Sequence, residues 1–276
     1  MQAEVLLREG RLDDALRELE SSIRKNPSDA KLRVFLFQLL CVRGDWDRAL
    51  TQLNVAAEMN PLNLLMAQVC RPALACEALR RDVFQGKRTP LVLGQPDEWV
   101  GWIIESSRLT AAGKHADAES LRARALDAAP AVAGTIDGQP FAWIADADSR
   151  LGPMLEAIVD GKYYWTPFSN VSKVTIDEPT DLRDAVWAPA HFTWTNGGQT
   201  VGLIPTRYPG SESSTDAAVR LARTTAWEAA GSETYVGLGH RVWATDAGEH
   251  PLLKVREVTL GPQPVEAAQP PEPTNG

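Results

Sequence analysis

Residues that carry metal or nucleophilic chemistry are scarce in this sequence, which has three cysteines and four histidines among 276 residues. The cysteines, Cys41, Cys70 and Cys76, are odd in number and do not resemble a secreted disulfide framework, so we expect reduced, buried thiols. The histidines are His115, His191, His240 and His250. They share no H-x-x-x-H or H-x-x-E-H spacing, and no metal site is predicted.

Long apolar runs and nucleotide or nucleophile motifs are lacking as well. No run approaches the roughly 20 apolar residues that a membrane helix needs. The first residues pass directly into a charged amphipathic pattern without a signal-peptide pattern. There is no P-loop and no G-x-S-x-G motif, and the G-x-G at Gly237 and Gly239 precedes a strand-like run, as a turn does. These absences predict a cytoplasmic, non-enzymatic protein without a cofactor.

Basic residues are fewer than acidic ones, with 28 Lys+Arg against 36 Asp+Glu and a net charge of −8. Residues 1–130 hold 18 of each, whereas the remaining 146 residues hold 10 basic and 18 acidic residues. The acidic balance argues against nucleic acid and anionic membranes as main partners. The length fits two domains, and the uneven charge predicts that their surfaces differ.

Internal repetition is the strongest positive signal. Six positions recur after 34 residues: Gly10, Leu12, Ala15, Leu19, Ser22 and Pro27 correspond to Gly44, Trp46, Ala49, Leu53, Ala56 and Pro61. The glycine permits a tight turn between helices, the alanine permits their close approach, and the proline follows the second helix. A third copy contains Gly113 and begins near Trp99. This period predicts tetratricopeptide-type helical hairpins over 1–130, with an irregular helical segment at 62–98.

The composition changes after Pro130, since six of the nine tryptophans lie beyond it and Gly and Pro become frequent. Strand-like runs separated by turn signals are KYYWTPF, VSKVTI, AHFTWT, TVGLIPTRY, HRVWAT and LLKVREVTL. They predict an α+β domain over 131–260, built on a small, mostly antiparallel sheet or partly open barrel. We expect helices at Leu151–Val159, capped by Asp146 or Asp148, and at Asp216–Trp227. The proline-rich residues 261–276 predict a disordered tail.

A basic run lies in and after the irregular segment, comprising Arg71, Arg80, Arg81, Lys87 and Arg88. We expect a solvated helix face that also serves as a docking surface for the acidic C-terminal half. Anion binding is the alternative.

The order of these features resembles the ImpE/TagJ family of bacterial type VI secretion accessory proteins. The matching segments are Leu32–Leu50, Cys76–Gly94, Asp137–Phe168, Asp181–Glu212 and Leu238–Val258. The resemblance implies a tetratricopeptide half joined to a family-specific α+β domain, and a cytoplasmic, non-enzymatic role. It further implies binding to the small subunit of the contractile sheath through that subunit's N-terminal helical region, near the ATPase that recycles sheaths.

Two other function classes remain open. The first is a small-molecule or anion-binding enzyme or sensor in the C-terminal domain, on a surface formed by Tyr163, Tyr164, Trp165, Asp181, Arg183, Trp187 and Arg241. Core and interdomain packing is the competing explanation for these aromatic side chains. The second is a general co-chaperone that captures peptide tails, which would need a basic carboxylate clamp on the first helices.

The partner surface expected from the repeats is the concave face formed by the first helix of each hairpin. It comprises Leu7, Arg8, Lys31, Val34, Gln38, Cys41, Val42, Val100, Ile103, Ser107 and Thr110. Its apolar members fit an amphipathic helix laid into a groove. Coverage of this face by residues 62–98 or by the C-terminal domain is the competing explanation. The alternative surface for the partner is then the C-terminal face with Tyr164, Trp165, Asp181, Arg183 and Arg241.

Overall fold

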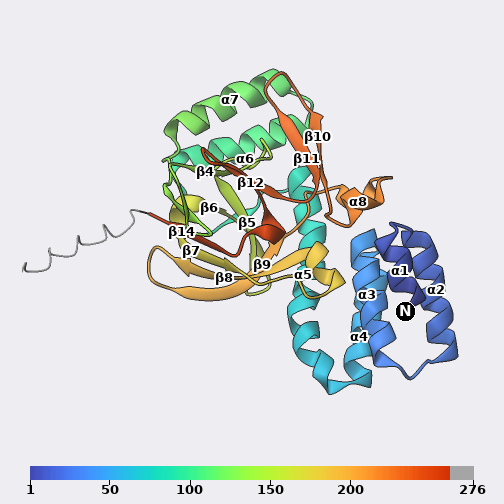
Figure 1. The fold of residues 1–276 in the computed structure, drawn as a ribbon. Helices are drawn as coiled ribbons and strands as arrows, with labels where there is room; N and C mark the ends of the chain where they lie inside the picture. The colour runs from blue at the N-terminus through green and yellow to red at the C-terminus, as the bar shows by residue number, and fades with distance from the viewer. Residues whose placement is uncertain (262–276) are drawn as a thin grey trace, which may run out of the picture.

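The computed structural model describes residues 1–261, so the predicted proline-rich tail lies outside the described residues apart from its first glycine. The long helices are α1 (Gln2–Arg8), α2 (Leu12–Lys25), α3 (Ala30–Arg43), α4 (Trp46–Met59), α5 (Leu64–Phe84), α6 (Glu98–Ala111) and α7 (His115–Ala128). Helices α1–α4 lie on one side of α5 and the strands lie on the other, while α6 and α7 lie near the C-terminal end of α5 (Figure 1).

The predicted helical hairpins are confirmed, and the repeated residues act as expected at their turns. Gly10, Gly44 and Gly113 have φ angles of 77°, 76° and 74°, a left-handed conformation that glycine adopts without steric cost. The repeated Ala15 and Ala49 are fully buried, which lets the paired helices approach closely.

The irregular segment is one long helix followed by extended chain. Helix α5 has 21 residues and contains Pro72. No second helix follows it in the described structure: the chain runs without a helix to Asp97 and contributes the short strand β1 (Leu91–Val92). Consequently α5 has no hairpin partner of its own.

The C-terminal half is strand-rich, as predicted, but its main sheet is large. Its strand order is β1-β6-β5-β9-β8-β7-β14-β2-β3, with only the β1–β6 pair parallel. The remaining strands of this sheet are β2 (Gly134–Ile136), β3 (Gln139–Phe141), β5 (Met154–Val159), β6 (Lys162–Pro167), β7 (Val171–Ile176), β8 (Trp187–Trp194), β9 (Gln199–Pro205) and β14 (Glu257–Leu260). Nine strands exceed the small sheet that the sequence predicted.

Two smaller sheets complete this half. One consists of β4 (Ile144–Asp146), β12 (Val242–Thr245) and β13 (Gly248–Pro251), and the other is a ribbon of β10 (Thr225–Ala229) and β11 (Tyr235–Gly239). The only α-helix among the described residues after α7 is the single turn α8 (Ala217–Arg220), and a short 3-10 helix, η3 (Leu182–Ala185), precedes β8.

Both helices expected in this half were wrongly predicted over most of their length. Residues 151–159 form a turn and the fully buried strand β5, because a short apolar run is compatible with either structure. The helix expected at 216–227 is reduced to α8, and Thr225 already belongs to β10. By contrast, the predicted Asn-Gly hairpin is confirmed as β8–β9, with Gly197 at φ 84°.

The two halves share one hydrophobic core. Trp187 of β8 lies 6.1 Å from Trp46 of α4, and Trp165 of β6 lies 5.4 Å from Phe84 of α5, between ring centroids. A second core lies within the strands, where Phe168 meets Trp243 edge-on at 5.7 Å. The repeats and the main sheet therefore pack as one body.

The turn glycines give a matched test of this packing. An ideal Cβ at Gly44 would lie 2.6 Å from Cγ of Glu212, whereas one at Gly113 would meet nothing within 4 Å. Gly113→Ala should cost about 1 kcal/mol from its left-handed backbone alone. Gly44→Ala should cost more, because Glu212 must also move. Urea unfolding of both variants measures the difference, and equal costs would contradict the contact.

Candidate functional site

A buried ionic network joins the repeats to the sheet. Arg80 of α5 donates from Nε to Oε1 of Glu156 at 2.7 Å and from Nη2 to Oε2 at 3.1 Å. Its Nη2 also donates to the carbonyl oxygen of Arg207 at 2.7 Å. Arg241 forms ion pairs with both Glu156 and Asp146, and all of these side chains are almost completely buried.

Neutral side chains complete this network. The Tyr163 hydroxyl donates to Glu156, and Nε1 of Trp165 donates to the Tyr163 oxygen at 2.6 Å. Burial would raise the pKa of Glu156, but the guanidinium groups of Arg80 and Arg241 lower it to about 2. Burial raises the pKa of Asp146 to about 6 despite its pairing with Arg241. Asp146 thus forms an ion pair with Arg241, which is distant in the sequence. The prediction that Asp146 caps a helix is wrong.

The alternative surface around Trp165 and Arg241 does not assemble. Both side chains are fully buried in the network, Tyr164 is half-buried, and Trp187 donates to Glu77 at 2.8 Å. Asp181 and Arg183 lie instead at η3, 3.2 Å apart, beside α3. The packing explanation for the aromatic residues therefore applies, and the structure brings together no surface of the predicted set.

Most of the predicted concave surface is covered. Eight of its residues are buried: Leu7, Gln38, Cys41, Val42, Val100, Ile103, Ser107 and Thr110. The C-terminal half reaches α3 through Arg207, whose Nη1 donates to the carbonyl of Val42 at 2.8 Å and whose Nη2 donates to that of Cys41 at 3.2 Å. The expectation of one continuous free groove along all three repeats is thus wrong.

The part of this surface that stays open forms what we call the concave groove, with a volume of about 600 Å³. It is lined by Glu4, Leu7, Arg8, Lys31, Val34, Phe35, Gln38 and residues 179–182. Arg8, Lys31 and Asp181 place charges of both signs around an apolar floor that includes Val34. The structure therefore joins one residue of the alternative surface, Asp181, to the first two repeats.

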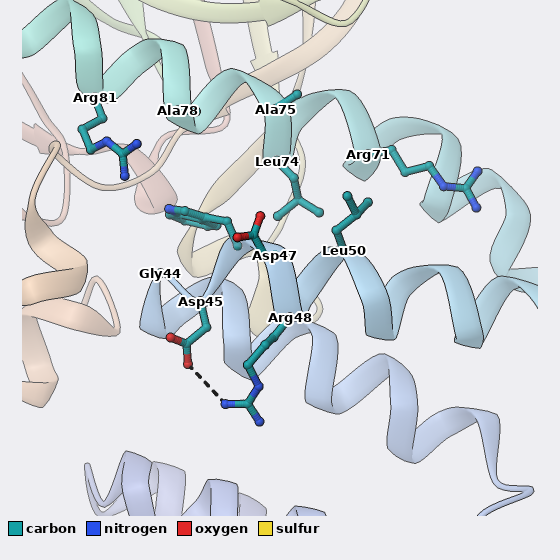
Figure 2. Close-up of a pocket in the computed structure, with 11 residues that line it drawn as sticks. Gly44, Asp45, Asp47, Arg48, Leu50, Arg71, Leu74, Ala75, Ala78 and Arg81 are labelled. Carbon is teal, nitrogen blue, oxygen red and sulfur yellow. Dashed lines mark ion pairs between the residues drawn. The ribbon is translucent and has the colours of Figure 1, made fainter.

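A second hollow, the α4–α5 groove, has a volume of about 530 Å³. Figure 2 shows Leu50 and Leu74 between the two helices, with Arg71 and Arg81 toward opposite ends. Both arginines belong to the basic run of the sequence, from which no groove was predicted. Of that run, Arg80 does dock onto the C-terminal half, as expected, through Glu156.

The cysteines and histidines form no chemical cluster within residues 1–261. The three cysteines are free and buried, and burial raises the pKa of Cys70 and Cys76 to about 11. No three His, Cys, Asp or Glu side chains in the described part of the chain are placed to hold a metal ion. None of the described helices is long and apolar enough to cross a membrane.

Known proteins resemble both halves of this chain. The family model described as "ImpE protein" matches residues 138–259, and a tetratricopeptide repeat model matches residues 6–69. The type VI secretion system accessory component TagJ of Pseudomonas aeruginosa is 50% identical over 262 residues, covering 95% of this chain and 92% of that protein. The crystal structure of protein VPA1032 from Vibrio parahaemolyticus superposes with a TM-score of 0.85 at 27% identity, covering 95% of this chain and 98% of that one.

The ionic network predicts that substitutions of two adjacent arginines change the free energy of unfolding by very different amounts. Arg80→Met leaves Glu156 with one guanidinium partner fewer in a buried site and should lower the free energy of unfolding by about 3–5 kcal/mol. Arg81→Met changes an exposed neighbour and should cost less than about 0.5 kcal/mol. Urea denaturation compares the two, and similar stabilities would contradict the structural role of the network.

A buried histidine gives stability a defined pH dependence. Burial, with Lys254 and Arg241 nearby, lowers the pKa of His240 to about 4, and its Nε2 accepts a hydrogen bond from the backbone N–H of Leu253 at 3.0 Å. Its contribution is therefore present above pH 6.5 and is lost as the pH falls toward 4.

Comparison with His240→Gln isolates this contribution, because Asp146 titrates in both proteins. Between pH 7 and pH 5 the wild type should lose about 2 kcal/mol more than the variant. Urea unfolding at both pH values measures it, and an identical loss in the two proteins would show that His240 titrates normally.

Proposed function

Because the chain belongs to the ImpE/TagJ family of type VI secretion accessory components, we propose that it is a non-enzymatic adaptor acting in the cytoplasm. Its partner is the small subunit of the contractile sheath, held through that subunit's N-terminal helix near the sheath-recycling ATPase. The main support for this binding mode is the concave groove, which stays open on α1 and α3. The rest of the predicted concave face is covered.

The lining of the concave groove supports a helical partner. Val34 and Phe35 provide half-buried apolar surface on α3, beside the nearly buried Leu7 of α1. An amphipathic helix binds such a groove through apolar side chains at i, i+3, i+4 and i+7. Arg8, Lys31 and Asp181 at the rim can then orient it through exposed charges.

The other function classes are less well supported. An enzyme or sensor at Trp165 and Arg241 would need access to side chains that are fully buried. A tail-capturing co-chaperone would need a uniformly basic clamp, whereas Glu4 and Asp181 line the same groove as Arg8 and Lys31. Charges of both signs favour binding of the side of a helix over binding of the free C-terminal carboxylate of a peptide.

Pull-down of the small sheath subunit tests the proposed partner directly. The full chain should retain the intact subunit and lose it when the subunit's first helix is deleted. Equal retention of both forms would overturn the proposed recognition element, and retention of neither would overturn the partner.

Val34→Asp tests the surface. It places a carboxylate on the apolar floor of the concave groove and should weaken binding of the sheath-helix peptide at least about tenfold, as calorimetry would measure. Val69→Asp is the matched control, because Val69 is exposed on α5 outside the groove and its change should leave binding intact. Normal binding by Val34→Asp, with melting near wild type, would exclude this groove. Ile103 cannot serve as a test, since it is only 1% exposed.

A further inference from the structure

The α4–α5 groove lies beside α5, the helix that has no hairpin partner. Helices α3 and α6 each pair with a following helix of 14 residues, α4 and α7. After α5 the chain instead contributes β1 to the sheet. The groove beside α5 is consequently an open helix-packing surface, and it shares no lining residue with the concave groove.

Its floor has the properties of a helix-packing face. Ala75 and Ala78 are exposed on α5, and small residues allow another helix backbone to approach closely. Leu50 of α4 is 37% exposed and adds apolar area to the same floor. Trp46 lines the same groove and packs against Trp187, so its ring is fixed in place. An apolar stripe on a partner helix would cover these side chains.

One arginine of α5 lies at each end of this floor (Figure 2). Arg71 and Arg81 are ten residues apart on α5, roughly 15 Å or three turns along the axis. Arg81 forms no ion pair with any residue that the structure describes, and Arg71 donates to the neutral Oδ1 of Asn54 at 2.7 Å. These two guanidinium groups are thus available to carboxylates of a partner.

Neither acidic residue of the groove forms an ion pair with Arg71 or Arg81 among the residues that the structure describes. Asp45 already pairs with Arg43 at 3.2 Å and lies 3.8 Å from Arg48. Asp47 stands in the first turn of α4, where the positive end of the helix dipole stabilises it. The groove therefore holds the carboxylate of Asp47 on α4 together with the two guanidinium groups at its ends on α5.

We propose that the α4–α5 groove is a second docking site, which binds an amphipathic helix of a partner protein bearing carboxylates at both ends of a three-turn apolar stripe. The apolar stripe covers Leu50, Ala75 and Ala78, and the carboxylates pair with Arg71 and Arg81. The site is independent of the sheath-helix proposal, because it uses different residues and a different charge pattern.

Peptide titration with the full chain tests this site. The probe is a labelled helical peptide of about four turns with leucines along one face and a glutamate at each end of that face, three turns apart. Its partner probe carries lysines in place of the glutamates. Fluorescence anisotropy should show the glutamate peptide binding the wild type about tenfold tighter than the lysine peptide.

Charge reversal locates the binding. The double variant Arg71→Glu with Arg81→Glu should reverse the preference between the peptides, and Ala78→Trp should weaken both by filling the floor. The same charge change at two exposed lysines outside the groove, Lys114→Glu with Lys162→Glu, should alter neither affinity. Melting temperatures near wild type establish that the variants fold. Equal binding of the two peptides to the wild type, or unchanged binding of the glutamate peptide to the double variant, would overturn the proposal.

Discussion

The ion pairs of Glu156 constrain the rest of the structure, because their members come from both halves of the chain. Arg80 belongs to the repeats, whereas Glu156 and Arg241 belong to the strands. Separating the halves would remove Arg80 from Glu156 and leave this carboxylate with one guanidinium partner fewer. It would also expose the hydrophobic core in which Trp46 packs against Trp187. The repeats are therefore fixed against the sheet, and this attachment determines which surfaces of the hairpins remain accessible.

The sequence predicted the features that depend on local patterns and missed those that depend on tertiary contact. The repeat glycines and the Asn-Gly hairpin require particular backbone conformations, so their positions were predictable. Strand β5 was missed because five apolar residues interrupted by Glu156 carry no decisive periodicity, although the Asp160-Gly161 turn after it matched the turn signals used elsewhere.

In the candidate site, too, features set by local pattern were predictable and those set by tertiary contact were not. Arg80 and Arg81 are adjacent in one basic run, yet the first is buried and the second is exposed, since neighbouring helix positions lie about 100° apart. A helical plot of α5 would have placed Arg80 with the buried Cys70, Ala73 and Glu77. No local pattern could show that Arg207, far along the chain, binds the carbonyls at the end of α3 and closes the predicted groove there.

Rigid attachment has a consequence for binding by two grooves. A preorganised groove loses little conformational entropy when a helix binds, so more of the contact energy is retained as affinity. The concave groove presents Arg8, Lys31 and Asp181 around its apolar residues, whereas the α4–α5 groove places an arginine at each end with acidic residues on the α4 side. Two helices with different charge patterns would therefore select different grooves, and like-charge repulsion would penalise the wrong choice. With both proposed sites occupied, the chain would hold two helical segments in a fixed relative position.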